Sequence, residues 1–158
     1  MLKIIASVNS AGYIGKGNKL LYNDKRDMLH FKSTTMNDVV IMGYNTYLSM
    51  NRKPLKNRVN IVLTNNHLEI ESTDRIIFTN SISLILDLSI DNTVWGIGGG
   101  GIYDKFINLC YEIVLTEIND DRIGDTKFPY FDKSKYVCST IDSYDNVVIN
   151  SYKKILYV

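Results

Sequence analysis

Val94-Trp95-Gly96-Ile97-Gly98-Gly99-Gly100-Gly101-Ile102-Tyr103 is the stretch that decides the fold of this chain. Thr93–Ile97 is short, apolar and β-branched, which predicts a buried strand that runs straight into four consecutive glycines. Gly101–Leu109 follows with an apolar stripe at helical spacing and predicts a helix. A strand, a glycine turn and a helix in this order place backbone N–H groups at a helix start, where phosphate binds well.

The glycines Gly96, Gly98 and Gly101 also match the literal G-x-G-x-x-G spacing of dinucleotide-binding proteins. That fingerprint normally belongs to the first strand–helix turn, with an acidic residue about 20 residues later. Here the motif comes late in the chain, and Glu117 is a loose candidate for the acidic residue. We therefore do not read it as that fingerprint, and a glycine turn that merely packs closely stays an alternative.

Runs typical of strands alternate with helical segments along most of the chain. The predicted strands are Leu2–Val8, Val39–Met42, Arg58–Leu63, Arg75–Thr79, Thr93–Ile97, Tyr111–Ile118, Tyr136–Ile141 and Val147–Val158. The predicted helices are Asp24–Thr35, Tyr44–Met50, Ser81–Leu88, with Ile82, Ile85 and Leu86 on one partly buried face, and Gly101–Leu109. Strands alternating with helices indicate right-handed crossovers and parallel pairing. We predict one α/β domain over residues 1–158, with a mostly parallel central sheet of about eight strands, an antiparallel C-terminal edge strand and about four flanking helices.

Composition narrows the possible functions. Hydrophobic residues make up 45% of the 158 residues, and 18 Lys and Arg balance 17 Asp and Glu. This balance argues against a nucleic-acid binder, and the chain lacks the apolar run of about 18 residues that a spanning helix needs. The N-terminus is too short and too β-branched for a signal peptide, and we expect no membrane partner.

Metal and disulfide chemistry also have few candidates. Cys110 and Cys138 lie among apolar or strand-like neighbours, and we expect both to be buried free thiols. His30 and His67 are the only histidines, so we expect no metal centre.

Asp27 is the second signal for function. It lies in the first turn of a predicted helix, and Phe31 follows one turn later on the same face. One interpretation is purely local, with Asp24 as N-cap and Asp27 reaching back in the first turn. The other is a carboxylate that faces an apolar ligand pocket, where desolvation raises its pKa and a cationic or amidine-like ligand edge pairs with it. His30 lies three residues after Asp27, so an Asp27–His30 dyad is also possible.

A glycine-rich segment, Gly12–Asn23, joins the first strand to the Asp27 helix. Its three glycines with apolar residues between them suggest a mobile lid that can still bury Ile14 and Leu20. A plain surface loop is the alternative.

Taken together, in this order and spacing, the motifs resemble the dihydrofolate reductase family from Ile4 to about Tyr152. The stretches that carry the resemblance are Ile14-Gly15; Asp27, Phe31, Lys32 and Thr35; Val40-Ile41-Met42-Gly43 with Thr46; Arg52, Pro54-Leu55 and Arg58; Ile97-Gly98-Gly99-Gly100 with Tyr103; Leu115-Thr116; and Gly124-Asp125-Thr126-Lys127-Phe128-Pro129. The resemblance implies a monomeric, cytoplasmic reductase that uses NADPH to convert 7,8-dihydrofolate to tetrahydrofolate and that binds antifolate-type inhibitors.

The resemblance also implies roles for individual residues. Asp27, Tyr22 and Thr116 would be catalytic, with Asp27 holding the pterin and Thr116 bonded to Asp27 or to the pterin amino group. The substrate would lie against Ile5, Asp27, Met28, Phe31, Ser49, Met50, Arg52, Leu55, Arg58, Ile97, Tyr103 and Thr116, with Arg58 on its glutamate carboxylate. The cofactor would lie against Ser7, Ile14, Gly15, Asn18, Lys19, Leu20, Gly43, Tyr44, Asn45, Thr46, Leu63, Thr64, Asn65, Asn80, Ile97, Gly98, Gly99, Gly100, Gly101, Ile102, Tyr103 and Thr126. Gly98–Gly99 would be a cis peptide.

Several residues depart from the family pattern. Tyr22 stands where most bacterial members carry Trp and Leu21 where Pro is common, while Ser7 replaces a typical Ala. The neutral residues Tyr44, Asn80 and Gly101 stand where basic residues are often found near the cofactor's 2′-phosphate. Two other interpretations stay open: the riboflavin-pathway pyrimidine reductase, which shares the glycine turn, and a non-catalytic binding or structural protein built on this fold.

Overall fold

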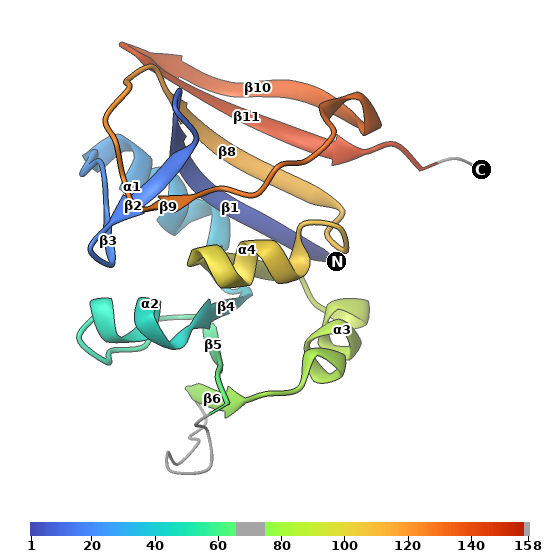
Figure 1. The fold of residues 1–158 in the computed structure, drawn as a ribbon. Helices are drawn as coiled ribbons and strands as arrows, with labels where there is room; N and C mark the ends of the chain where they lie inside the picture. The colour runs from blue at the N-terminus through green and yellow to red at the C-terminus, as the bar shows by residue number, and fades with distance from the viewer. Residues whose placement is uncertain (66–74, 157–158) are drawn as a thin grey trace.

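An eight-stranded sheet runs through the molecule in the computed structural model, which describes residues 1–65 and 75–156 (Figure 1). The strands lie in the order β10-β11-β8-β1-β7-β4-β5-β6. Their bounds are β1 Leu2–Asn9, β4 Val39–Gly43, β5 Val59–Leu63, β6 Ile76–Thr79, β7 Val94–Gly98, β8 Glu112–Ile118, β10 Tyr136–Tyr144 and β11 Val147–Lys154. The helices are α1 Lys25–Thr35, α2 Tyr44–Ser49, α3 Ile82–Asp91, α4 Gly100–Phe106 and the short 3-10 helix η2 Lys133–Lys135.

Six of these strands pair in parallel, as predicted, and the C-terminal hairpin adds antiparallel pairing at one edge. Strand β11 lies between β8 and β10, so β10 rather than the C-terminal strand is outermost. The predicted strand Val147–Val158 ends earlier, at Lys154. The last two residues of that prediction, Tyr157 and Val158, lie outside the described residues.

Neighbouring residues of β1 point to opposite faces of the sheet, because side chains alternate along a strand. Ile4 belongs to the core cluster that contains residues of α3 and α4, whereas Ile5 belongs to the cluster against which aromatic residues of α1 and α2 pack. In Figure 1, α4 lies in front of the sheet and α1 behind it. Helices therefore cover both faces, as doubly wound sheets require.

The helix starts follow local capping rules. The Asp24 side chain accepts from the Arg26 N–H ahead of α1, and the Ser81 side chain accepts from the Leu84 N–H ahead of α3. On α3, Ile85 is fully buried, but Ile82 is 39% exposed and does not share the buried face that we predicted. The helix meets the sheet along a narrower stripe than its apolar content indicates.

The segment predicted as a loop contains a second, small sheet. Strands β2 Tyr13–Lys16, β3 Lys19–Leu20 and β9 Thr126–Lys127 pair in the order β3-β2-β9. Gly17 and Asn18 connect β2 to β3 with φ of +58° and +59°, the left-handed values that a two-residue hairpin of type I′ needs. Ile14 is buried as predicted, but the prediction for Leu20 is wrong because its side chain is 69% exposed on the short β3.

Cys110 is buried and Cys138 is exposed, both as free thiols, so burial is confirmed for Cys110 alone. Cys138 is exposed because it lies on β10, the outer strand of the sheet. His67 falls outside the described residues. Across residues 1–65 and 75–156, every helix falls short of the length and apolar character needed to cross a membrane.

Candidate active site

The Asp27 carboxylate and the Thr116 hydroxyl meet at the centre of the site. Asp27 lies in the first turn of α1 and Thr116 on β8, and the Thr116 Oγ1 donates to Asp27 Oδ1 at 2.5 Å. Asp24 caps the helix, so Asp27 makes a tertiary contact rather than the local capping contact of the first interpretation. The Thr116 side chain is almost fully buried, which fixes the carboxylate against the sheet.

Burial raises the pKa of the Asp27 carboxyl above its usual range, and nearby Asp24 adds to the rise. The Thr116 hydrogen bond and the nearby His30 act in the opposite direction, because both favour the charged form. Burial lowers the pKa of His30, whereas the negative charges of Asp27 and Asp142 act to raise it. His30 Nδ1 lies 3.4 Å from Thr34 Oγ1, and its buried Nε2 makes no hydrogen bond, so the interaction of His30 with Asp27 is electrostatic rather than a hydrogen-bonded dyad.

An apolar wall surrounds this carboxylate. Ile5 is buried in the cluster on the α1 and α2 face. The predicted substrate-site side chains that pack against that cluster are Phe31, Met50, Leu55 and Ile97, and Tyr22, predicted as catalytic, packs there as well. Met28 is on α1 but 56% exposed. The structure thus brings most of the predicted substrate wall onto one face of the sheet.

Arg58 lies at the outer end of this wall, and three acceptors orient its guanidinium. Its Nε donates to Thr35 Oγ1 at 2.9 Å, and its two terminal nitrogens donate to the carbonyl oxygens of Lys56 at 2.8 Å and Lys32 at 3.0 Å. Partial burial lowers the pKa of Arg58, but an arginine stays charged. A guanidinium has five N–H donors, so one on each terminal nitrogen stays available for a carboxylate.

Three other residues predicted for the substrate site, Arg52, Ser49 and Tyr103, lie less favourably for contact with a ligand. Arg52 is exposed and has a φ of +57°, and Ser49 donates its hydroxyl to the Thr46 carbonyl at 2.6 Å. Tyr103 is buried, and its hydroxyl donates to the Ile5 carbonyl at 2.9 Å. It therefore supports the middle of β1, and burial raises the pKa of its hydroxyl well above the usual range.

The glycine turn forms a cradle between α2 and α4. Gly98–Gly99 is a cis peptide, as the resemblance implied. A Cβ on Gly99 would lie 3.6 Å from Thr46 Oγ1, and one on Gly98 would lie 3.2 Å from the Tyr103 hydroxyl. Gly101 has open space around it, since a Cβ there would meet nothing within 4 Å. Bare backbone at the start of α4, together with a threonine hydroxyl, fits a pyrophosphate group.

The carboxyl ends of β4, β5 and β6 lie beside this cradle and carry neutral polar residues. They are Tyr44 and Asn45 after β4, Thr64 and Asn65 after β5, and Asn80 after β6. Gly43 and Leu63 are paired at the ends of β4 and β5, which places these groups along one edge. Of these neutral residues, Tyr44 and Asn80 stand where other members of the resembled family often carry basic residues.

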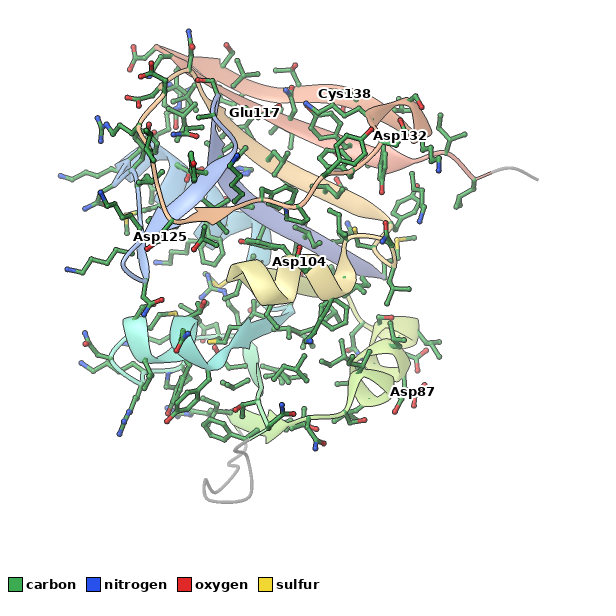
Figure 2. The ribbon with its side chains drawn as sticks, in the orientation of Figure 1. Asp87, Asp104, Glu117, Asp125, Asp132 and Cys138 are labelled. Carbon is green, nitrogen blue, oxygen red and sulfur yellow. The ribbon has the colours of Figure 1, made fainter. Side chains whose placement is uncertain are left out.

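The β2–β3 hairpin is tied to the segment before β9. The Gly17 N–H donates to Asp125 Oδ2 at 2.8 Å, and Asp125, labelled in Figure 2, donates its own N–H to the Gly15 carbonyl at 3.0 Å. A Cβ on Gly100 would lie 2.8 Å from Thr126 Cγ2, so β9 also touches the glycine turn. The exposed Asn18, Lys19 and Leu20 form the tip of this hairpin. The predicted lid residues therefore lie next to the cofactor turn.

Sequence reasoning missed two side chains that order the lid. The Asn9 Oδ1 accepts from the N–H groups of Ala11 and Tyr13, at 3.2 and 2.9 Å. Arg122 lies over the Tyr22 ring, with 4.7 Å from its Cζ to the ring centroid. The Tyr22 hydroxyl oxygen is buried, and burial raises its pKa. The Gly17-Asn18 pair was a sequence signal for a hairpin in the lid. Nothing in the local sequence indicates that Asn9 and Arg122 would contact the lid.

A family model described as dihydrofolate reductase matches residues 1–156. The chain belongs to the dihydrofolate reductase family. Its relatives include the dihydrofolate reductase of Ureaplasma parvum serovar 3, which is 30% identical over 152 residues and covered to 96% in both chains. A dihydrofolate reductase of Buchnera aphidicola subsp. Acyrthosiphon pisum is 34% identical over 131 residues, or 82% of this chain and 80% of that relative.

A solved structure of this family has the same fold. The dihydrofolate reductase of Enterococcus faecalis, complexed with NADP(H) and RAB-propyl, matches with a TM-score of 0.83 and 26% identity over 98% of this chain and 96% of that one. As a member of the dihydrofolate reductase family, the chain is an NADPH-dependent oxidoreductase that acts on dihydrofolate. The alternative assignments to a pyrimidine reductase and to a non-catalytic protein are thereby set aside.

Proposed function

We propose that the chain converts 7,8-dihydrofolate to 5,6,7,8-tetrahydrofolate by hydride transfer to C6 and protonation at N5, with Asp27 holding the pterin. The observation that carries this assignment is the Asp27–Thr116 hydrogen bond, which fixes a partly buried carboxylate between α1 and β8. A carboxylate of this kind suits a ring that presents an amino group beside an N–H, because both donors find an acceptor.

Asp27 would act in two ways in this reaction. Its two oxygens would accept hydrogen bonds from the pterin amino group and ring N–H, and each charge-assisted bond contributes about 1.5–3 kcal/mol. Its negative charge would also favour the protonated pterin, since an opposite charge nearby stabilises a cation. Protonation at N5 makes C6 the better hydride acceptor. Thr116 would keep the carboxylate in place through both steps, and Tyr22 would close the pocket on the lid side.

The rest of the substrate would follow the apolar wall outward. Phe31, Met50 and Leu55 would hold the aromatic part between α1 and the segment after α2. Arg58 would take a carboxylate of the glutamate tail with its two remaining terminal N–H groups. The three internal bonds of Arg58 support this role, because a guanidinium held in one orientation loses little entropy on binding.

The residues around the glycine turn fit NADPH, which supplies the hydride when it is bound. The N–H groups at the start of α4 and the Thr46 hydroxyl would hold the pyrophosphate. The polar residues after β4, β5 and β6 would hold the 2′-phosphate as neutral donors. Lys16, Lys19, Lys53 and Lys56 are exposed and would be the candidates to add positive charge from neighbouring loops.

The oligomeric state, the cellular location and the metabolic role of the protein remain predictions from the sequence. We propose that the protein works as a monomer, as the resemblance to the family implies. A cytoplasmic location, binding of antifolate-type inhibitors and a supply of tetrahydrofolate for one-carbon metabolism and thymidylate synthesis stay predictions.

The direct test follows the loss of NADPH absorbance in the presence of dihydrofolate. We expect turnover with dihydrofolate and none with the pyrimidine substrate of the riboflavin pathway. Turnover of the pyrimidine alone, or binding of both molecules without turnover, would contradict the proposal.

A further inference from the structure

The segment between α2 and β5 carries Leu55 and Arg58 and has an unusual backbone. Asn51, Arg52 and Asn57 have φ values of +56°, +57° and +59°. Residues other than glycine rarely adopt this left-handed region, although Asn tolerates it better than most. A segment with three such residues does not keep its shape through local preferences alone. Contacts from the rest of the fold must hold it.

Asn60 provides these contacts from the start of the strand that follows. It is the second residue of β5, and its side chain is fully buried. Its Oδ1 accepts from the Leu55 N–H at 2.8 Å, and its Nδ2 donates to the Leu55 carbonyl at 2.9 Å. The same Nδ2 lies 3.2 Å from the Arg58 carbonyl and 3.4 Å from the Arg75 carbonyl. One side-chain amide thus binds both backbone groups of Leu55 and the backbone of Arg58.

We infer that Asn60 is a positioning residue for the acidic tail of the substrate, because it fixes the backbone from which Leu55 and Arg58 reach the ligand. This inference rests on the proposed function, in which Arg58 binds the tail carboxylate. Arg58 has three internal acceptors for its guanidinium, but these set the orientation of the head group only. The Asn60 amide holds the Arg58 carbonyl itself, while bonds from the Asn37 N–H to the Asn57 carbonyl and from the Val59 N–H to the Asp38 carbonyl hold the neighbouring residues.

An amide side chain suits this task for a chemical reason. Leu55 presents one donor and one acceptor inward, and an amide offers a matching acceptor and donor in one plane. Aspartate would lack the donor, and leucine would leave both backbone groups buried without partners, which costs about 1–3 kcal/mol for each group. The role is therefore specific to Asn at this position, which local sequence patterns do not reveal.

The test compares two diaminopteridine inhibitors, one with a p-aminobenzoylglutamate tail and one without it. In Asn60→Ala, we expect the dissociation constant of the tailed inhibitor to rise about 10-fold or more, on the scale of one charge-assisted hydrogen bond, and that of the tailless inhibitor to change less than about 3-fold. For dihydrofolate turnover, KM should rise more than kcat falls. Equal weakening of both inhibitors would overturn the inference and indicate a general structural role.

Asn9→Ala is the matched control. Asn9 is also a buried asparagine that binds loop backbone, but its partners are Ala11, Tyr13 and Arg122 on the lid side. Its replacement should leave the ratio of the two dissociation constants within about 2-fold of wild type, because the Asn9 side chain makes no hydrogen bond, among the described residues, to Leu55, Arg58 or the rest of the segment between α2 and β5. A shift in that ratio as large as the one in Asn60→Ala would show that the ratio reports loop disorder in general, and it would overturn the inference.

A double-mutant cycle separates this inference from the proposed function. In the Arg58→Leu background, Asn60→Ala should weaken the tailed inhibitor clearly less than in the wild-type background, because Arg58 is gone and only Leu55 remains for Asn60 to position. Additive losses would overturn the role of Asn60 while leaving that of Arg58 intact. If Arg58→Leu alone binds the tailed inhibitor like wild type, the proposed tail site fails instead.

Two further measurements cover the case in which Asn60→Ala does not fold. Asn60→Ser, which is smaller but keeps a polar group, should show the same selective loss for the tailed inhibitor. In the wild-type protein, the Leu55 amide should exchange slowly with solvent, because its acceptor is a buried side chain. Exchange as fast as that of an open loop would overturn the inference without any substitution.

Discussion

Replacing Asp27 with asparagine tests the proposed chemistry with the least change in shape. The Thr116 hydroxyl can still donate to the remaining side-chain oxygen, so the contact between α1 and β8 persists. The substitution removes the charge and turns one acceptor into a donor that faces a donor on the pterin. We expect a large loss of rate at neutral pH.

The size of the loss follows from the bonds involved. Two charge-assisted hydrogen bonds to the pterin become at most one neutral bond, which costs about 3 kcal/mol if each charged bond contributes about 1.5–3 kcal/mol. A barrier increase of about 1.4 kcal/mol corresponds to a factor of ten, so kcat/KM should fall about 100-fold at pH 7. Part of the activity should return at acid pH, where the free substrate is already protonated.

The assay follows NADPH oxidation between pH 5 and pH 9 for the wild type, Asp27→Asn and a control, Asp24→Asn. Asp24 caps the same helix, and asparagine is an equally good N-cap, so the control should keep its rate within about 3-fold of wild type. A wild-type rate for Asp27→Asn at pH 7 would refute the assignment. An equal loss in both variants would show that α1 has been disturbed rather than the pterin contact.

The raised pKa of Asp27 also predicts the effect on stability. Its folded-state pKa lies above the unfolded value, so the native state binds protons more tightly and the free energy of unfolding falls as pH rises through the folded-state pKa. Asp27→Asn removes this cost at neutral pH. Urea melts at pH 7 should therefore show a variant at least as stable as the wild type, and a clear loss of stability would contradict the pKa argument.

Three more outcomes are expected. Arg58→Leu should weaken dihydrofolate binding about 10-fold or more while sparing a pterin fragment without glutamate, measured by fluorescence titration; equal weakening would make Arg58 a supporting residue. The enzyme should prefer NADPH over NADH by a smaller margin than a site with two arginines would give, which the ratio of the two kcat/KM values at two salt concentrations measures. A strong preference that does not change with salt would contradict a 2′-phosphate site made of neutral donors. A thiol reagent should label Cys138 in the native protein, whereas Cys110, with its pKa raised by burial to about 11, should react only after unfolding; native labelling of both would contradict its burial.

Local signals predicted the elements well because they depend on near neighbours in the chain. The N-cap Asp24, the apolar run of β7 and the glycines that follow it each act within a few residues. The lid hairpin was missed although Gly17-Asn18 is a two-residue turn signal, because the flanking strands are very short. Strand β9, which completes the small sheet, comes from far along the chain and has no local signal.

The sequence by itself determined which segments form the strands of the main sheet and the four α-helices, the glycine turn and the residue types available for chemistry. Only the tertiary structure decided that Asp27 bonds to Thr116 across 89 residues, and that Asn60 rather than a neighbour holds the backbone of Leu55. The physical reason is that capping, turn and periodicity preferences arise within a few residues, whereas the partner of a buried polar group is set by which strands pair and in what register. Strand order and register depend on contacts summed over the whole chain, so these partners emerge only in the folded molecule.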